Sequence, residues 1–144
     1  MNKELTREIA LVTGGSRGIG RAAAVALAKA GAGVAVNFNR RESEAQAVCG
    51  EVEAGGRRAL AVRADVSKAA EVARLVEAVE KGLGSIDILV NNAGISLPQP
   101  LSEITERDWE NVLTVNLKSV FLVTQAVQTE EISMWLWGRA SIKL

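Results

Sequence analysis

The 144-residue sequence contains no histidine, no tyrosine and a single cysteine, Cys49. Without a second thiol no internal disulfide can form, and without histidine the usual ligands of a structural zinc site are missing. A reaction that needs a phenol or an imidazole as its acid or base is closed to this chain alone. We therefore expect no metal site, and the lone thiol favours a reducing, cytoplasmic location.

An excess of positive charge and a long apolar run are also missing. Lysine plus arginine and aspartate plus glutamate number 17 each, so no basic excess favours binding to nucleic acid. No apolar run reaches the length of about 20 residues that crosses a membrane. The charged N-terminus, residues 1–8, lacks the apolar core of a signal peptide. We expect neither a nucleic-acid partner nor a membrane association.

Aromatic residues make up only 3% of the chain, whereas hydrophobic residues make up 48%, so we expect an aliphatic core. Apolar runs alternate with segments of helical spacing. Strands are predicted at 9–13, 34–38, 59–62 and 86–90, and helices at 19–30, 42–54, 68–81 and from Thr105 onward. Because the strand runs are apolar throughout, both of their faces should be buried. The pattern predicts an α/β fold, a Rossmann-type doubly wound parallel sheet with helices on both faces.

Three glycines, Gly14, Gly18 and Gly20, fall where the first strand should turn into the first helix. Glycine lets a ligand approach the bare backbone, and the N-terminus of a helix attracts a phosphate. In the same turn, the Ser16 hydroxyl and the Arg17 guanidinium are candidate phosphate ligands. The turn therefore predicts dinucleotide binding. The alternatives are a tight turn without a ligand and a solvated Arg17.

The end of the second strand bears on the choice of cofactor. Many dinucleotide folds place a carboxylate here against the ribose 2′-hydroxyl, but this chain has no acid before Glu42. Arg40, together with Arg17, would instead attract a 2′-phosphate. This favours NADP(H) over NAD(H), unless Arg40 and Arg41 simply begin a solvated helix.

Polar residues also follow the third and fourth strands. Asp65 is a candidate acceptor for an adenine amino group, with Val66 lining the ring, although a helix-capping aspartate is an alternative. Ser67 is a predicted N-cap residue. The tetrad 91–94, Asn-Asn-Ala-Gly, follows the fourth strand, where ligands enter such sheets. Its alternative is a turn without ligand contact.

The helix from Thr105 carries an apolar stripe and begins with a predicted capping box of Thr105 and Asp108. The stripe is predicted to be buried and comprises Trp109, Val112, Leu113, Leu117, Val120, Phe121 and Thr124. Asn116 interrupts it, and a structural amide bonded to backbone or water is its simplest interpretation.

Together, segments 13–20, 65–66 and 91–94 and the helix with Asn116 resemble the short-chain dehydrogenase/reductase family, particularly bacterial 3-oxoacyl-acyl-carrier-protein reductases. The resemblance covers about residues 5–128 and implies hydride transfer between NAD(P)(H) and a carbonyl substrate. It implies that Arg40 meets the 2′-phosphate, that Asp65 and Val66 meet the adenine, and that Asn116 supports a water in the proton relay. It assigns the pyrophosphate and nearby ribose to Gly14, Ser16, Arg17, Gly18, Ile19 and Gly20, and the nicotinamide ribose to Asn92, Ala93 and Gly94.

The family's chemistry also needs a serine, then a tyrosine and a lysine at Y-x3-K spacing, and this sequence has no tyrosine. The resemblance is lost near Gln128. We therefore expect an incomplete dinucleotide-binding domain at 1–128, truncated after the fourth or fifth strand, and a non-family tail at 129–144. Such a chain should bind nucleotide with little or no turnover and self-associate through uncovered surfaces. The alternative is a non-catalytic nucleotide-binding or protein-interaction module that uses Trp135 and Trp137.

Overall fold

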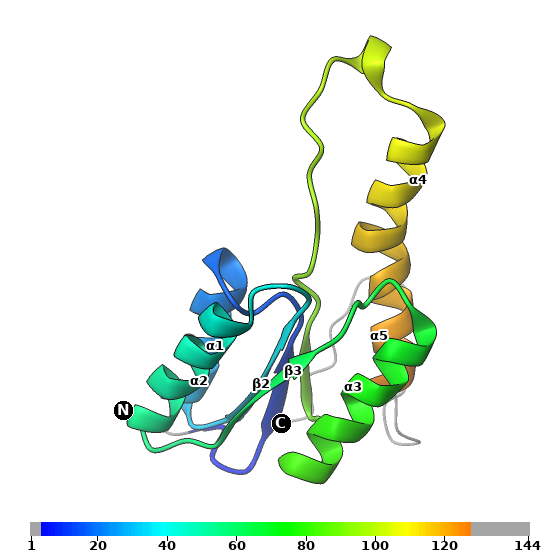
Figure 1. Ribbon diagram of the computed structural model, residues 1–144. Coiled ribbons are helices and arrows are strands. Elements are labelled where there is room, and N and C mark those ends of the chain that lie inside the picture. Colours follow the sequence, from blue (N-terminus) through cyan, green and yellow to red (C-terminus); the bar gives the residue numbers. More distant parts are fainter. Residues whose placement is uncertain (1–3, 128–144) are drawn as a thin grey trace.

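The computed structural model describes residues 4–127, which build a four-stranded parallel sheet flanked by helices (Figure 1). The sheet order is β3-β2-β1-β4, and every neighbouring pair is parallel. The strands are β1 (Ile9–Val12), β2 (Gly33–Phe38), β3 (Ala59–Arg63) and β4 (Ile88–Val90). The connecting helices are α1 (Gly18–Ala30), α2 (Glu42–Ala54) and α3 (Ala69–Gly82). The predicted α/β architecture is confirmed.

Both faces of the sheet are covered, as the uniformly apolar strands indicate. On one face, Val12, Val34 and Val36 pack with buried residues of α1 and α2. On the other face, Leu11 and Ala35 pack with buried residues of α3 and of the last described helix. Successive side chains of a strand point to opposite faces, so each strand supplies two cores.

The parallel register places the loops that follow the strands at one edge of the sheet. Val12 at the end of β1 pairs with Val36 of β2 and with Val90 of β4. At the next step of the sheet, Phe38 at the end of β2 pairs with Arg63 at the end of β3. All the segments predicted to bind a nucleotide therefore start from this carboxyl edge.

After β4 the chain climbs away from the sheet and returns as a long helix (Figure 1). The short 3-10 turn η1 (Leu101–Glu103) precedes α4 (Glu106–Leu113), whose predicted capping box is present. A π-helical turn, η2 (Thr114–Lys118), joins α4 to α5 (Ser119–Val127). Val123 and Val127 of α5 belong to the core shared with α3.

The prediction that the stripe on this helix is buried is wrong. The exposed fractions of Trp109, Leu117 and Phe121 are 61%, 65% and 61%, and Leu113 and Val120 are also exposed. The physical reason is that α4 rises beyond the sheet, and among residues 4–127 no other element covers it (Figure 1). Within residues 4–127, α5 is covered on the face that packs with α3 and with the core beneath the sheet.

No helix within residues 4–127 combines the length and the apolar character needed to cross a bilayer. The predicted tail at 129–144, with Trp135, Trp137 and a stub of a fifth strand at 140–142, lies outside the described residues.

Candidate functional site

The turn between β1 and α1 offers an open helix N-terminus. Arg17 is the N-cap residue of α1, but its side chain makes no capping hydrogen bond. The first turn of the helix contains no acidic residue. The first backbone N–H groups of α1 therefore lack a side-chain acceptor, and their positive dipole end can bind an anion.

The glycines of the turn serve two different purposes. Gly14 has a φ of +59°, and a methyl group on its Cα would lie 2.9 Å from Ala93 Cα. A methyl group on Gly20 would overlap the side-chain amide of Asn92. By contrast, a methyl group on Gly18 would meet nothing within 4 Å, although the φ of +55° still favours glycine there. Gly14 and Gly20 thus allow close packing, whereas Gly18 leaves its backbone open to a ligand.

Thr13 and Asn92 join the turn to the segment after β4. Thr13 Oγ1 accepts hydrogen bonds from the backbone N–H groups of Asn92 and Ala93, at 3.0 and 3.1 Å. Asn92 Nδ2 in turn donates to the carbonyl oxygens of Thr13 and Gly14, at 3.0 and 2.9 Å. The side chain of Asn92 is therefore engaged in holding the ends of β1 and β4 together.

Asn116 holds the next part of the same segment. Its Oδ1 accepts a hydrogen bond from the Ile95 N–H at 2.7 Å, and its Nδ2 donates to the Ile95 carbonyl oxygen at 2.9 Å. The interpretation of Asn116 as an amide bonded to backbone is confirmed. Asn116 lies in the π-helical turn η2, an irregularity that is often found at functional sites. A methyl group on Gly94 would approach Asn116 Oδ1 to 3.2 Å, so the two segments are in close contact.

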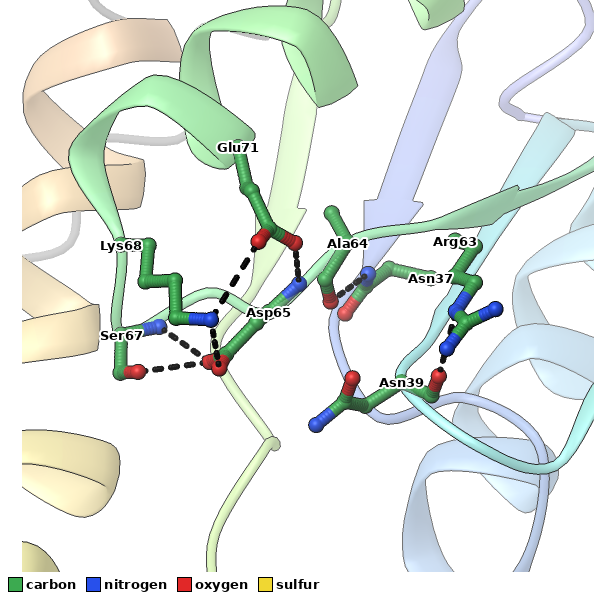
Figure 2. Close-up of polar contacts among 8 residues, drawn as sticks. All are labelled: Asn37, Asn39, Arg63, Ala64, Asp65, Ser67, Lys68 and Glu71. Atoms are coloured by element: carbon green, nitrogen blue, oxygen red, sulfur yellow. Dashed lines mark hydrogen bonds and ion pairs between the residues drawn. The ribbon is translucent and has the colours of Figure 1, made fainter.

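Asp65, after β3, belongs to a compact polar network (Figure 2). Its Oδ1 accepts hydrogen bonds from the backbone N–H and the hydroxyl of Ser67, at 3.1 and 2.6 Å. The ammonium of Lys68 lies 3.5 Å from both Asp65 Oδ2 and Glu71 Oε1. The prediction that Ser67 caps α3 is wrong: Lys68 is the N-cap residue, and the Ser67 hydroxyl is engaged by Asp65 instead.

This network keeps two carboxyl groups ionised. Burial alone would raise the pKa of Asp65, but the Ser67 hydrogen bonds and the Lys68 ammonium outweigh it, and the pKa lies below its ordinary value. The pKa of Glu71 is lowered mainly by the Asp65 N–H, which donates to Glu71 Oε2 at 2.7 Å. At neutral pH, Asp65 is therefore a negatively charged acceptor with lone pairs still available.

Arginines line two hollows at this edge, in a grouping that differs from the expected one. Arg17 and Arg41 line the hollow beside the N-terminus of α1, and Arg41 also pairs with Glu44 at 2.9 Å. Arg40 lines a second hollow together with Asp65. The structure thus does not bring Arg17 and Arg40 into one hollow, where the sequence analysis expected both beside a single phosphate.

The family model for short chain dehydrogenases matches residues 8–135. The chain belongs to the short-chain dehydrogenase family. Its glycine turn, its Asn-Ala-Gly segment at 92–94 and its parallel sheet are therefore the parts of a short-chain dehydrogenase fold, as the resemblance implies.

Individual relatives support this assignment. A 3-oxoacyl-(acyl-carrier-protein) reductase of Synechocystis is 46% identical over 123 residues, which cover 85% of this chain and 50% of the relative. For the enzyme of the same name from Staphylococcus epidermidis, the identity is 45% over 118 residues, 82% of this chain and 48% of the relative. The chain spans about half the length of the curated relatives it matches.

Solved structures of short-chain dehydrogenases match the fold as well. The enzyme from Burkholderia cenocepacia, in complex with NADP, has a TM-score of 0.82 and 45% identity, covering 85% of this chain and 50% of that chain. The structure of a protein from Sinorhizobium meliloti, described as a short-chain alcohol dehydrogenase, matches with a TM-score of 0.82 and 42% identity. The match covers 88% of this chain and 50% of that chain.

Two of the predicted ligand residues differ sharply in burial. Ile19 is 81% exposed at the start of α1, beside the open N-terminus of the helix. Val66 is only 5% exposed and packs in the core with Val72 and Leu75. The side chain of Val66 is therefore part of the hydrophobic core, whereas that of Ile19 is accessible to a ligand.

The sequence analysis did not predict that Thr13 and Asn37 would join the loops of the candidate site. Both are buried polar residues at strand ends, with exposed fractions of 2% each. A buried polar side chain needs hydrogen-bond partners, so its presence inside an apolar run was the available signal. Apart from the carbonyl of the adjacent Phe38, the partners lie 23 to 80 residues away and could not be identified from the sequence.

Proposed function

We propose that this chain binds NADP(H) at the carboxyl edge of its sheet, with the diphosphate at the N-terminus of α1. The observation that carries the proposal is the uncapped start of α1, where Gly18 faces open space beside the Arg17 side chain. Exposed Ile19 supports it, because a nucleotide would cover this apolar side chain. The relative from Burkholderia cenocepacia, solved in complex with NADP, supports the choice of ligand.

We propose that Arg40 contacts the 2′-phosphate and that Asp65 accepts from the adenine amino group, because both line one hollow. Within residues 4–127, Arg40 has no carboxylate partner, so its charge is available. Gly14, Ser16 and Gly20 would shape the phosphate turn, and Val66 would support the adenine side from within the core. We propose that Asn92, Ala93 and Gly94 lead toward the nicotinamide ribose.

We expect NADPH to bind roughly tenfold more tightly than NADH, because the extra phosphate meets a guanidinium and no carboxylate follows β2 directly. Titration of the 144-residue chain with each reduced nucleotide, followed by nucleotide fluorescence, measures both dissociation constants. Repeating the NADPH titration at higher salt should weaken binding, because the contact is solvent-exposed. Equal affinities, or tighter NADH binding, would contradict the role of Arg40.

We further propose that the carbonyl chemistry of the family needs residues that this chain does not supply. The relatives named as 3-oxoacyl reductases favour a carbonyl substrate of that class. The chain has no tyrosine to donate a proton to the substrate oxygen. Asn116 alone, bonded to Ile95, is a supporting group, so we propose nucleotide binding without turnover by this chain.

We also propose self-association through the exposed stripe on α4, η2 and α5. Trp109, Leu113, Leu117 and Phe121 recur every four residues along the helix and are all exposed, as an apolar stripe that favours association. Sedimentation velocity should show oligomers at micromolar concentrations, and Leu117→Glu should shift them toward monomer. Gln46→Glu, on the exposed surface of α2 and away from the stripe, is the matched charge control. A wild-type monomer at every concentration would refute the proposal.

A further inference from the structure

We propose that Asn37 is a positioning residue that sets the spacing between the phosphate turn and the loop carrying Asp65. The inference rests on the proposed nucleotide site. Asn37 lies near the end of β2, the strand between β1 and β3 in the sheet. Figure 2 shows its side chain directed toward Ala64, immediately before Asp65. The Asn37 side chain thus lies between the phosphate turn after β1 and the loop that carries Asp65.

Both the oxygen and the nitrogen of the Asn37 carboxamide form hydrogen bonds. Its Oδ1 accepts a hydrogen bond from the Gly14 N–H, at 3.2 Å. Its Nδ2 lies within hydrogen-bonding distance of three carbonyl oxygens, those of Phe38, Val62 and Ala64, at 3.4, 3.3 and 3.1 Å. The backbone carbonyl of Asn37 also accepts from the Gly15 N–H at 2.9 Å. The turn after β1 and the end of β3 are therefore held by one residue.

The chemistry of this position requires an acceptor and a donor on one short side chain. The Asn37 side chain is 2% exposed, so water cannot replace a missing partner. Leucine would leave the Gly14 N–H and the Ala64 carbonyl without their bonds. An ionised aspartate would keep the Gly14 contact but would point a negative oxygen at carbonyl oxygens.

The consequence for the ligand follows from where the two bonded segments lead. Gly14 opens the turn that reaches the N-terminus of α1, the proposed diphosphate site. Ala64 immediately precedes Asp65, the proposed adenine contact. A nucleotide that binds both ends at once depends on their separation, so loosening this link should weaken binding even in the folded protein.

The first test compares Asn37→Leu with Val79→Ala in the 144-residue chain. Val79 is fully buried on α3 and belongs to the core cluster on one face of the sheet, so its truncation destabilises without touching the Gly14 or Ala64 contacts. NADP⁺ affinity is measured by calorimetry, and the folded fraction by urea denaturation. We expect Asn37→Leu to weaken NADP⁺ binding about tenfold and Val79→Ala to leave it unchanged.

The second test uses Asn37→Asp, which keeps the shape of the side chain. Buried among carbonyl oxygens, this carboxyl should have a raised pKa, and its protonated form can donate as the amide does. The charged side chains drawn with it in Figure 2 are Arg63, Asp65, Lys68 and Glu71, of which the two carboxyls have lowered pKa values and stay ionised. The affinity ratio of variant to wild type should therefore recover as the pH falls from about 8 to about 5.5.

The ratio to wild type at each pH cancels the titration of the nucleotide phosphate itself, whose second pKa is about 6. Recovery of Asn37→Asp at low pH supports the inference even if Asn37→Leu does not fold. Wild-type affinity in folded Asn37→Leu, or a ratio for Asn37→Asp that stays near one at high pH, overturns it while leaving the proposed function intact. A wild-type chain that binds no NADP⁺ overturns the proposed function and this inference with it.

Discussion

Replacing Gly20 with alanine is expected to destabilise the protein by roughly 3 kcal/mol, a typical cost of severe overpacking. The added methyl group would overlap the Asn92 amide and the Gly14 carbonyl oxygen, and it would lie 3.0 Å from Gly15 Cα. Two of these neighbours are backbone atoms, which cannot rotate away. The Asn92 hydrogen bonds to Thr13 and Gly14 would be lost as the side chain is displaced. Urea denaturation measures the change in the free energy of unfolding.

The matched control is Gly50→Ala, which makes the same chemical change in the middle of α2. A methyl group on Gly50 would meet nothing within 4 Å, and the residue is exposed. Because alanine is the better helix former, this variant should be more stable than wild type by roughly 0.5–1 kcal/mol. Opposite signs for the two variants would attribute the effect to the contact with Asn92. A stability loss below about 0.5 kcal/mol for Gly20→Ala would refute the packing role.

The elements of the sheet could be predicted because their signals are local. Apolar runs fixed the strands to within two residues, and Glu42–Ala54 has the predicted bounds of α2. The glycine spacing located the turn, although it did not reveal that Gly14 and Gly20 serve packing while Gly18 stays open. That distinction depends on the chain near Asn92, which approaches the turn only after the sheet has formed.

The parts that could not be predicted depend on contacts between distant segments. Asn37 is a polar residue in an apolar run, but its partner Gly14 lies 23 residues earlier. The stripe from Trp109 to Phe121 has the spacing of a buried helix face, yet spacing cannot say whether another element covers it. In the same way, neighbouring Arg40 and Arg41 line different hollows, because the chain turns into α2 between them.

Replacing Arg40 with aspartate is expected to reverse the cofactor preference, so that NADH binds more tightly than NADPH. The change removes one positive charge and adds one negative charge beside a 2′-phosphate that carries nearly two negative charges. At a solvent-exposed site, unit charges about 4 Å apart interact by about 1 kcal/mol, and salt reduces this further. We therefore expect NADPH affinity to fall by roughly a hundredfold, which exceeds the roughly tenfold preference of the wild type. NADH affinity should stay near that of wild type, since NADH carries no 2′-phosphate.

Arg107→Asp is the control for net charge, because Arg107 is an exposed arginine on α4, outside the two hollows. It should leave the ratio of NADPH to NADH affinity unchanged, whereas Arg40→Asp should also flatten the salt dependence of NADPH binding. Arg41→Asp decides between the two hollows. Arg41 already pairs with Glu44. Arg41→Asp should therefore reduce NADPH affinity less than Arg40→Asp does. If Arg41→Asp reverses the preference and Arg40→Asp does not, the 2′-phosphate lies beside Arg17, and the assignment to Arg40 is wrong.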